Sequence, residues 1–576
     1  MFSRSSIHAV LGLWCVLIIV SPMLLMAQTK EASWRAEARW DTVDETGTAD
    51  IHRFTTDPGY VTPLVSYIPE HPTVPSPRDL LGYIVGTDGK LTHPNDEYRY
   101  FDALAKASPR VTIQELGFSE EGRRMILVFI SDEETIGNLD RYKAYNAALA
   151  DPRKTDEAEA LRIAERGKPI MTINAGLHSP ETGPPEMVME LAYRLAVSDH
   201  PDIKEIRDNV ITSIIPVTEV DGRARTIEWY YRYLTEYEDR DYMPARSPPY
   251  WGAHAYHDNN RDGLQMTLKL TQYYANMFHE WHPQYVLDLH ESVPLMYVSM
   301  GTGPYNELID PIAKTEWQWV ASWEVTRLNQ QGLKGVWTWG FYTGWNPGYL
   351  MWIALNHNSL GRFYETFGNM IPKTMERSLE NNRDAAGNRI TSEQWYRTNP
   401  PDKKVMWSLR NNTNYMQSGV LASLTLMARN GKTMLHNFWK KGYNSWQRGM
   451  SEAPYGWVIP GDQDARDRLV YLINQLGRHK IEVHRSTKDF KVGDSEYKKG
   501  DFVVRTDQPY GNYVRNLLRI TKFPTDAKYR PYDDVSWTLG KIYRVDTHEI
   551  SDKDLLDVKD LELVTAPVTL AGTMRG

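Results

Sequence analysis

Cysteine is almost absent from this chain of 576 residues, and its absence removes several mechanisms. The single cysteine, Cys15, lies inside an apolar N-terminal run. Once that run is removed, no disulfide can form and no cysteine nucleophile is available. An exported chain without disulfides is typical of a bacterial periplasmic or secreted enzyme rather than of a small disulfide-stapled domain.

Dense blocks of Lys and Arg are also lacking. The chain has 66 basic and 74 acidic residues, for a net charge of −8. This mild acidity argues against nucleic acid as the main partner. Internal repeats and low-complexity tracts are not evident, and the length predicts several domains rather than one.

The N-terminus is typical of an export signal. Arg4 supplies the positive end, and the stretch from Ala9 to Met26 is almost continuously apolar. Leu25-Met26-Ala27 before Gln28 suits cleavage after a small residue. We predict a signal peptide over residues 1–27, no stable membrane span after its removal, and a periplasmic or secreted protein. An uncleaved N-terminal anchor is the alternative.

The rest of the chain changes character along its length. Residues 28–94 are polar and rich in Pro, Thr and Asp, which predicts an N-terminal extension. Residues 95–385 alternate strand-like and helical runs. This alternation predicts a mixed, largely parallel open α/β sheet with helices on both faces. A polar linker at 386–402 precedes a smaller α/β domain at 403–576. In that domain we expect strands at 456–459, 481–483 and 502–504.

Two apolar runs, 169–177 and 285–289, each end in histidine. His178 follows the first run, with Glu181 three residues later, and His290 ends the second. In open α/β sheets, ligands bind outside the carboxyl ends of the strands, so we expect these side chains to meet there. Two histidines and one carboxylate suit zinc, with a fourth position left for water. The pattern therefore predicts metal-assisted hydrolysis.

Other histidines are given structural roles. His279-Glu280-Trp281-His282 is one residue short of the zinc-protease motif H-E-x-x-H, so we predict a helix end. His254, His257 and His357 are expected to be hydrogen-bonded loop or wall residues.

Several short segments, in the right order between about residues 95 and 375, resemble the zinc carboxypeptidase family of carboxypeptidase A-like metallopeptidases. They are Gly117–Arg123, His178–Glu181, Pro216–Gly222, Asp258–Asp262, Asp288–Ser292 and Gly361–Glu365. Pro180 and Thr218-Glu219-Val220 depart from the usual pattern and indicate a distant branch. The C-terminal part resembles an amidotransferase-like domain fused to some of these peptidases. Without cysteine that domain is expected to be non-catalytic.

The resemblance implies a role for each matching residue. His178, Glu181 and His290 would hold one Zn²⁺. Glu365 would be the general base that takes a proton from water and returns it to the leaving amine. Asp258 would orient His178 through its other ring nitrogen.

The resemblance also implies how the substrate is held. Asn260 and Arg261 would bind the free C-terminal carboxylate of a peptide or protein, which makes such an enzyme an exopeptidase. Tyr342 would close on the substrate. Arg232 would stabilise the oxyanion, with Arg223 and Arg225 as alternatives.

We therefore expect a zinc metallocarboxypeptidase. In the resembled family, the segment between the closing tyrosine and the catalytic glutamate supplies the base of the side-chain pocket. Here that segment, residues 343–364, contains no Asp or Glu, and a pocket for C-terminal Lys or Arg needs a buried negative partner. This absence predicts a preference for neutral, apolar or aromatic C-terminal residues. The alternatives are a zinc amidohydrolase on the same fold, acting on acyl-amino acids or cell-wall peptides, and a non-catalytic binding protein.

Overall fold

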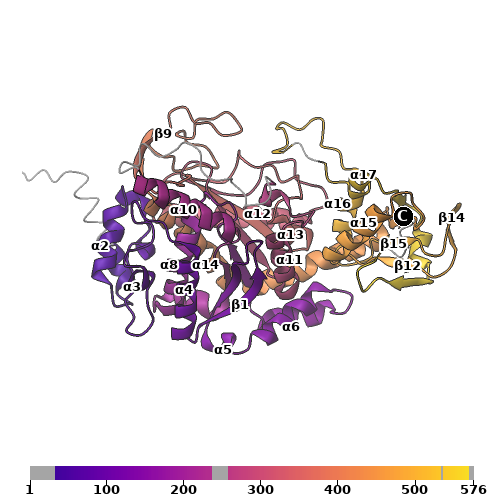
Figure 1. Cartoon of the computed structure of the whole chain (residues 1–576), viewed down its shortest axis with the longest axis horizontal. Helices are drawn as coiled ribbons and strands as arrows, with labels where there is room; N and C mark the ends of the chain where they lie inside the picture. The colour runs from indigo at the N-terminus through magenta and orange to yellow at the C-terminus, as the bar shows by residue number, and fades with distance from the viewer. Residues whose placement is uncertain (1–32, 237–256, 534–535, 570–576) are drawn as a thin grey trace, which may run out of the picture.

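A computed structural model describes residues 33–236, 257–533 and 536–569 (Figure 1). The predicted signal peptide at 1–27 lies outside the described residues. Across the described part of the chain, none of the helices combines the length and the apolar character that a bilayer span requires.

An eight-stranded sheet forms the centre of the molecule, in the order β1-β2-β4-β3-β5-β8-β6-β7. The strands β4, β3, β5 and β8 are parallel neighbours, whereas β1, β2 and β6 join through antiparallel pairs. Every residue of β3, β4, β5 and β8 is buried, as expected for strands covered on both faces. The predicted mixed sheet is confirmed. The strands are β1 (Val111–Phe118), β2 (Arg124–Ile130), β3 (Ile170–Asn174), β4 (Ile211–Ile215), β5 (Tyr285–His290), β6 (Met296–Val298), β7 (Val336–Trp337) and β8 (Leu360–Thr366).

Helices flank this sheet. Pro184 and Pro185 stand among the first residues of α8. Backbone N–H groups there have no partner within the helix, so proline, which lacks this group, costs no hydrogen bond. The helices are α4 (Pro94–Ala107), α5 (Glu133–Ile136), α6 (Leu139–Ala150), α7 (Glu157–Arg166), α8 (Gly183–Val197), α9 (Pro201–Asn209), α10 (Val220–Glu236), η4 (Asn259–Arg261), α11 (Lys269–Trp281), α12 (Pro311–Gln330) and α13 (Trp352–Asn356).

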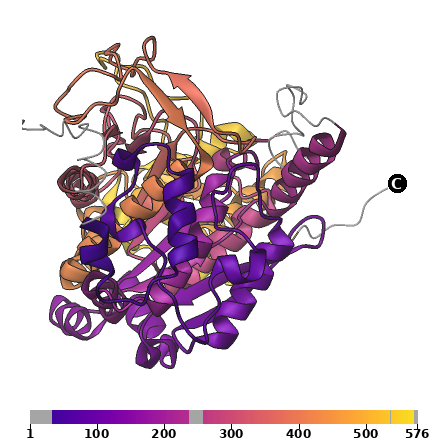
Figure 2. The ribbon, with the colours of Figure 1, turned by 90° about the vertical axis from the view of Figure 1, so that its left-hand side faces the viewer.

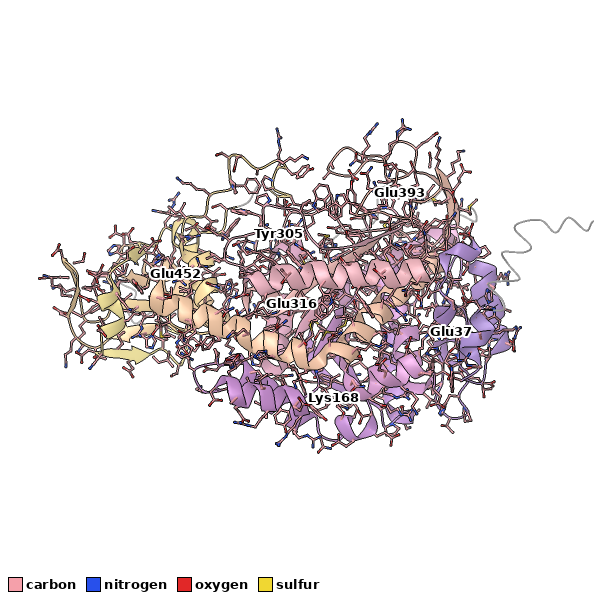
Figure 3. The ribbon with its side chains drawn as sticks, turned by 180° about the vertical axis from the view of Figure 1, so that it is seen from behind. Glu37, Lys168, Tyr305, Glu316, Glu393 and Glu452 are labelled. Atoms are coloured by element: carbon pink, nitrogen blue, oxygen red, sulfur yellow. The ribbon has the colours of Figure 1, made fainter. Side chains whose placement is uncertain are left out.

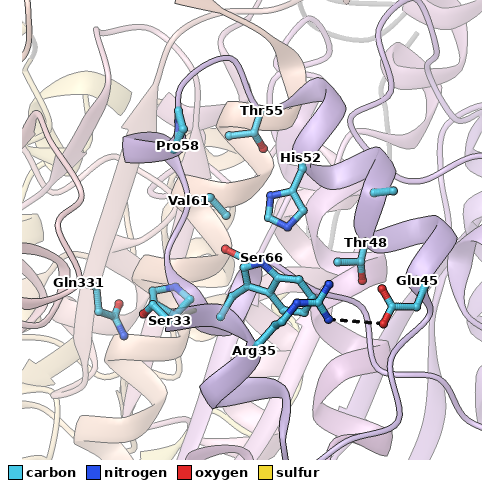
Figure 4. Close-up of a pocket in the computed structure, with 13 residues that line it drawn as sticks. Ser33, Arg35, Glu45, Thr48, His52, Thr55, Pro58, Val61, Ser66 and Gln331 are labelled. Carbon is cyan, nitrogen blue, oxygen red and sulfur yellow. Dashed lines mark ion pairs between the residues drawn. The ribbon is translucent and has the colours of Figure 1, made fainter. Parts of the chain in front are cut away.

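The N-terminal extension packs on the same core as the sheet. Ile51, Val65 and Tyr67 are buried in the cluster that contains the strands, which we name the first core. Figure 2 shows these indigo helices at one end of the molecule. The elements are α2 (Glu45–Phe54), η1 (Pro58–Tyr60), η2 (Pro63–Val65) and α3 (Pro77–Leu81). A cavity of about 460 Å³ lies among them, and its Arg35 and Glu45 form an ion pair at 3.7 Å (Figure 4).

One long helix, α14 (Leu409–Ser451), links the two ends of the molecule. Met416, Val420 and Leu424 bury its first half in the first core. Its second half runs beside α12 towards the C-terminal part, and Lys441 donates to Glu316 of α12 at 2.5 Å (Figure 3). The expected limits at 386–402 and 403–576 stay predictions, since α14 packs with both parts of the chain.

The C-terminal part has its own antiparallel sheet, β16-β11-β15-β12-β17, and a second core. Leu264 and Trp345 from the first part join that core. The strand expected at 481–483 begins later, at His484, because the side chain of Gln508 pairs with both backbone polar groups of Glu482. The remaining elements are β9 (Met375–Ser378), β10 (Lys404–Trp407), β11 (Gly456–Ile459), α15 (Arg466–Arg478), β12 (His484–Ser486), β13 (Phe490–Val492), β14 (Ser495–Tyr497), β15 (Phe502–Arg505), α16 (Gly511–Leu518), α17 (Leu539–Tyr543), β16 (His548–Ile550), η5 (Lys553–Asp557) and β17 (Leu561–Leu563).

A fully buried ion pair ties β8 to α12. Arg362 donates to both carboxylate oxygens of Glu324, at 2.7 and 2.8 Å, and both side chains are 0% exposed. Arg362 also donates to the backbone oxygen of Ser299 and to the hydroxyl of Tyr285, each at 2.8 Å. Breaking one side of such a pair leaves an uncompensated buried charge.

We expect Glu324→Leu to lower the free energy of unfolding by about 3–5 kcal/mol, because Arg362 would lose its partner. The double variant Glu324→Leu/Arg362→Met should lose less than the single variant. Chemical denaturation measures both. Ser322→Ala, at an exposed position of α12, is the control. A single variant as stable as this control would contradict the prediction.

Four histidines lie between the first core and the C-terminal part: His357 and His479 are buried, and His279 and His282 are half-buried. His279 and His282 lie at the end of α11, which confirms the predicted helix end. The rings of His279 and His357 are 4.5 Å apart, and His357 Nε2 contacts the backbone oxygen of His479 at 2.9 Å. Burial is the largest cause that lowers the pKa of each: to about 4 for His282 and His357, to about 3 for His479, and well below the ordinary value for His279.

These histidines should make the fold acid-sensitive. Below pH 6.5 the unfolded chain binds protons that the folded protein excludes, so stability falls as pH drops from about 6.5 towards 4. Each histidine contributes up to about 1.4 kcal/mol per pH unit in that window. His357→Gln should flatten the slope of unfolding free energy against pH. The exposed-residue variant His548→Gln should not, and identical slopes would refute the idea.

Candidate functional site

Parallel strand pairing brings the site together. His290 is the last residue of β5 and is the register partner of Glu365 on β8. β3 lies on the other side of β5, and His178 and Glu181 follow in the turn after β3. Gly176 begins this turn at φ +62°, a conformation that L side chains rarely adopt. The four candidate side chains therefore meet at the carboxyl ends of the neighbouring strands β3, β5 and β8.

Glu181 lies between the two histidines. Its Oε1 is 2.9 Å from His178 Nδ1, and its Oε2 is 3.0 Å from His290 Nδ1. One ligand atom from each residue lies within 4.8 Å of the others, and all three side chains are buried. Tetrahedral zinc with ligands at 2.0–2.2 Å separates those ligands by about 3.3 Å. The three side chains are thus close to the arrangement that one ion requires.

The outer nitrogen of each ring faces a second carboxylate. His178 Nε2 is 3.3 Å from Asp258, and His290 Nε2 is 2.7 Å from Asp288. A neutral imidazole has one N–H, and donation to these aspartates leaves both Nδ1 lone pairs directed at Glu181. In that tautomer the lone pairs and a carboxylate converge, and a cation must take the place of the ring protons that would otherwise lie between them. The residues fit a bound divalent metal ion.

The pKa shifts of the site also favour positive charge at its centre. Burial lowers the pKa of His178, but Glu181 and Asp258 outweigh it and raise the pKa to about 9. Asp288 and Glu181 likewise raise the pKa of His290 well above its ordinary value. Burial would raise the pKa of Glu181, yet the two histidines lower it to about 2. The site thus stabilises positive charge at its centre.

Glu365 is buried beside this centre, with 7% of its surface exposed. Its Oε2 has no hydrogen-bond partner within the described residues. Burial is the largest cause that raises its pKa, His290 lowers it, and Glu181 raises it, to a value of about 7. A carboxylate with a pKa near neutrality can both accept and release a proton.

A cavity of about 180 Å³ opens on these residues. Asn260 lines it, with its Oδ1 accepting from the Leu350 backbone at 2.9 Å. The guanidinium of Arg261 stacks on the ring of Tyr349 at 4.2 Å. The predicted residues on its wall are His178, Glu181, Asp258, Asn260, Arg261, His290, Tyr342 and Glu365, and the others are Asp288, Ser292, Phe341, Tyr349, Met351, Phe363 and Tyr532.

Two of the predicted substrate residues look different from expectation. Tyr342 is buried, and its hydroxyl accepts a hydrogen bond from Trp352 Nε1 at 2.6 Å. Arg232 is exposed on α10 and is not among the residues that line the cavity. The alternatives are also directed elsewhere: Arg223 pairs with Glu97 and Glu186, and Arg225 pairs with Glu121. The oxyanion role of an arginine stays a prediction, which this geometry does not support.

Three of the residues that sequence reasoning missed make polar or stacking contacts with predicted site residues. Asp288 could have been found, because alternate residues of a strand share a face and Asp288 stands two before His290. Tyr349 gave no distinct signal within an aromatic-rich segment. Asp533, which contacts Arg261, comes from the C-terminal part and could not be placed from the sequence.

The described residues contain one group of three potential metal ligands that converge, namely His178, Glu181 and His290. The cavity near the N-terminus has one histidine, and its Arg35 and Glu45 pair with each other. The metal-binding chemistry is thus concentrated at the edge of the main sheet.

Comparison with known proteins finds a family match in the part of the chain that carries the candidate ligands. Residues 97–324 match the model of the family described as zinc carboxypeptidase. This segment contains the three candidate ligands together with Asp258, Asn260 and Arg261, and it ends before Tyr342 and Glu365. No curated protein matches the sequence.

Solved structures of carboxypeptidases also align with the chain. A metallo-carboxypeptidase from Burkholderia cenocepacia is 15% identical, over 58% of this chain and 69% of that one, with a TM-score of 0.37. A metallo-carboxypeptidase from Pseudomonas aeruginosa, in complex with (2-guanidinoethylmercapto)succinic acid, is 12% identical over 59% and 70%, with a TM-score of 0.38. Carboxypeptidase A from Helicoverpa armigera is 15% identical over 61% and 74%, with a TM-score of 0.35. The predicted resemblance to the zinc carboxypeptidase family is confirmed through the family match of residues 97–324.

Proposed function

We propose that this chain is a zinc-dependent metallocarboxypeptidase that removes C-terminal residues from peptides or proteins. One observation carries the proposal: His290 and Glu365 are register partners on adjacent parallel strands, beside the His178–Glu181 turn. A zinc ion bound there would polarise the scissile carbonyl and lower the pKa of water.

We assign a different role to each residue around the metal position. Glu365 accepts a proton from the attacking water and returns it to the leaving amine, which its raised pKa favours. Asp258 and Asp288 hold the outer ring protons of the histidines and so keep both Nδ1 atoms directed at the metal position.

Substrate binding is assigned to two residues that line the same cavity. Asn260 and Arg261 would bind the terminal carboxylate, because a guanidinium offers a charged, two-pronged donor for it. Tyr342, which lies in the cavity wall, would close on the substrate. The oxyanion role expected of Arg232 is left out of the proposal, because Arg232 is exposed on α10 and does not line the cavity. The signal predicted at 1–27 would place this activity in the periplasm or outside the cell.

The terminal side chain should be neutral and apolar. Met351 and Phe363 line the cavity. Arg362, the one permanently charged residue of the segment 343–364, is buried against Glu324. This segment therefore provides no buried carboxylate for a C-terminal Lys or Arg.

Zinc binding and catalysis should separate in variants of the site. We expect His178→Ala to lose bound zinc, since it removes one of three ligands. Glu365→Gln should keep zinc and lose about 10²- to 10⁴-fold in hydrolysis rate, the usual contribution of a general base. Metal analysis of the purified protein and a peptide-hydrolysis assay give the two readouts. His548→Gln is the control, and undiminished hydrolysis by Glu365→Gln would exclude Glu365 as the base.

A panel of peptides that differ only in the last residue tests the direction of attack and the preference. Mass spectrometry should show release of single C-terminal residues, with higher kcat/KM for Phe and Leu than for Lys. The same peptides with amidated C-termini should be cut far more slowly, because their termini would offer Arg261 no negative charge. Faster release of Lys would refute the preference. Hydrolysis of acyl-amino acids alone would favour the amidohydrolase alternative.

A further inference from the structure

The guanidinium of Arg261 already holds a carboxylate of the same chain. Asp533 accepts from Arg261 Nε at 2.8 Å and from Nη2 at 3.3 Å. This two-pronged contact is the geometry with which arginine binds carboxylates generally. Asp533 lies 272 residues away in the sequence, in the C-terminal part of the chain.

Other donors complete a carboxylate-binding site around Asp533. The hydroxyl of Tyr349 donates to its Oδ2, and Asn346 Nδ2 lies 3.5 Å from the same atom. The side chains of Arg261 and Asp533 are 25% and 22% exposed, so water reaches the pair only in part.

The remaining edge of Arg261 is also occupied. Its Nη1 donates to the backbone oxygen of Asn260 at 3.1 Å and lies 3.4 Å from Asp258. Each nitrogen of the guanidinium therefore has an acceptor within the described residues. An external carboxylate finds no open edge while Asp533 stays in place.

Aromatic contacts hold the segment 520–533, which we name the covering segment. Phe523 packs on Trp345 with ring centroids 5.1 Å apart, and Tyr529 packs on Trp339 at 5.4 Å. Tyr532, directly before Asp533, packs on Phe341, Tyr342 and Tyr349 and lines the cavity. These contacts place the Asp533 carboxylate at Arg261 and make the covering segment part of the cavity wall.

We propose that Asp533 is an internal competitor for Arg261 that lowers the affinity of the site for free C-termini. The proposal rests on the proposed function, in which Arg261 binds the terminal carboxylate of the substrate. Two carboxylates cannot share the Nε–Nη2 edge of one guanidinium, so a substrate must displace Asp533 before its terminus can bind. Asp533 thus weakens the binding of free C-termini and leaves neutral termini unaffected.

Binding measurements test this without any need for turnover. The probes are N-acetyl-L-phenylalanine and N-acetyl-L-phenylalaninamide, titrated calorimetrically into zinc-loaded protein with Glu365→Gln. Asp533→Asn should tighten the acid by about tenfold, the usual worth of a charge-assisted hydrogen bond, and change the amide less than about twofold. Asp533→Glu, which keeps the charge, should bind the acid as weakly as the parent protein.

A double-variant cycle and a control complete the design. In an Arg261→Gln background, Asp533→Asn should give no gain, because the contested group is gone. Asp526→Asn, at an exposed position of the covering segment, should change neither probe. Equal tightening of acid and amide, or a gain that persists without Arg261, would overturn the proposal in favour of a purely structural role.

The kinetic form of the test separates this proposal from the proposed function. With Glu365 intact, Asp533→Asn should lower KM for peptides with a free C-terminus by about tenfold and leave kcat within about twofold. If no peptide is cut but the acid probe binds more tightly to Asp533→Asn, the peptidase function fails and the competition stands. If peptides are cut and Asp533→Asn changes neither KM nor acid binding, the competition fails and the peptidase function stands.

Discussion

The convergence of three lone-pair donors on one point is the constraint that organises this molecule. His178 and His290 each direct Nδ1 at Glu181, and Asp258 and Asp288 accept from the opposite ring nitrogens. Such a set is favourable in a buried place only with positive charge at its centre, supplied either by ring protons, whose binding the carboxylates favour by raising the histidine pKa values, or by a metal ion. The site therefore suits a cation, and the fold must hold its parts in place for one.

The sheet does this through register. Backbone pairing between β5 and β8 places His290 beside Glu365, and pairing between β3 and β5 places the following turn beside both. Beneath β8, the buried pair between Arg362 and Glu324 joins the strand to α12. Ladder hydrogen bonds and a buried ion pair both restrict movement of the strands. A metal site needs this restriction, since its ligands must stay within fractions of an ångström of their binding positions.

The sequence was informative about candidate site residues that stand at the end of a recognisable strand or in a family motif. Apolar runs that end in His178 and His290 predicted both the parallel strands and the ligands at their ends, and a family resemblance supplied Glu365. It was uninformative where a contact depends on tertiary packing alone. The strand expected at 481–483 begins at His484, because the backbone of Glu482 pairs with the side chain of Gln508, a contact between distant residues. Arg232, chosen by its distance from an Asp-Gly turn, lies on a helix whose direction the sequence does not reveal.

Through the contact between Asp533 and Arg261, the C-terminal part of the chain contributes to a site whose predicted residues all lie before residue 366. A peptidase that binds termini by charge alone would accept any free carboxylate that reaches the cavity. An internal carboxylate at the same guanidinium would lower the affinity for every free terminus by the same factor, so that a substrate would need further contacts, such as those with Met351 and Phe363, to bind at low concentration. The aromatic contacts of the covering segment would set that factor, since they determine how readily Asp533 can leave. The affinity of the site would then depend on packing far along the chain as well as on the residues around the metal position.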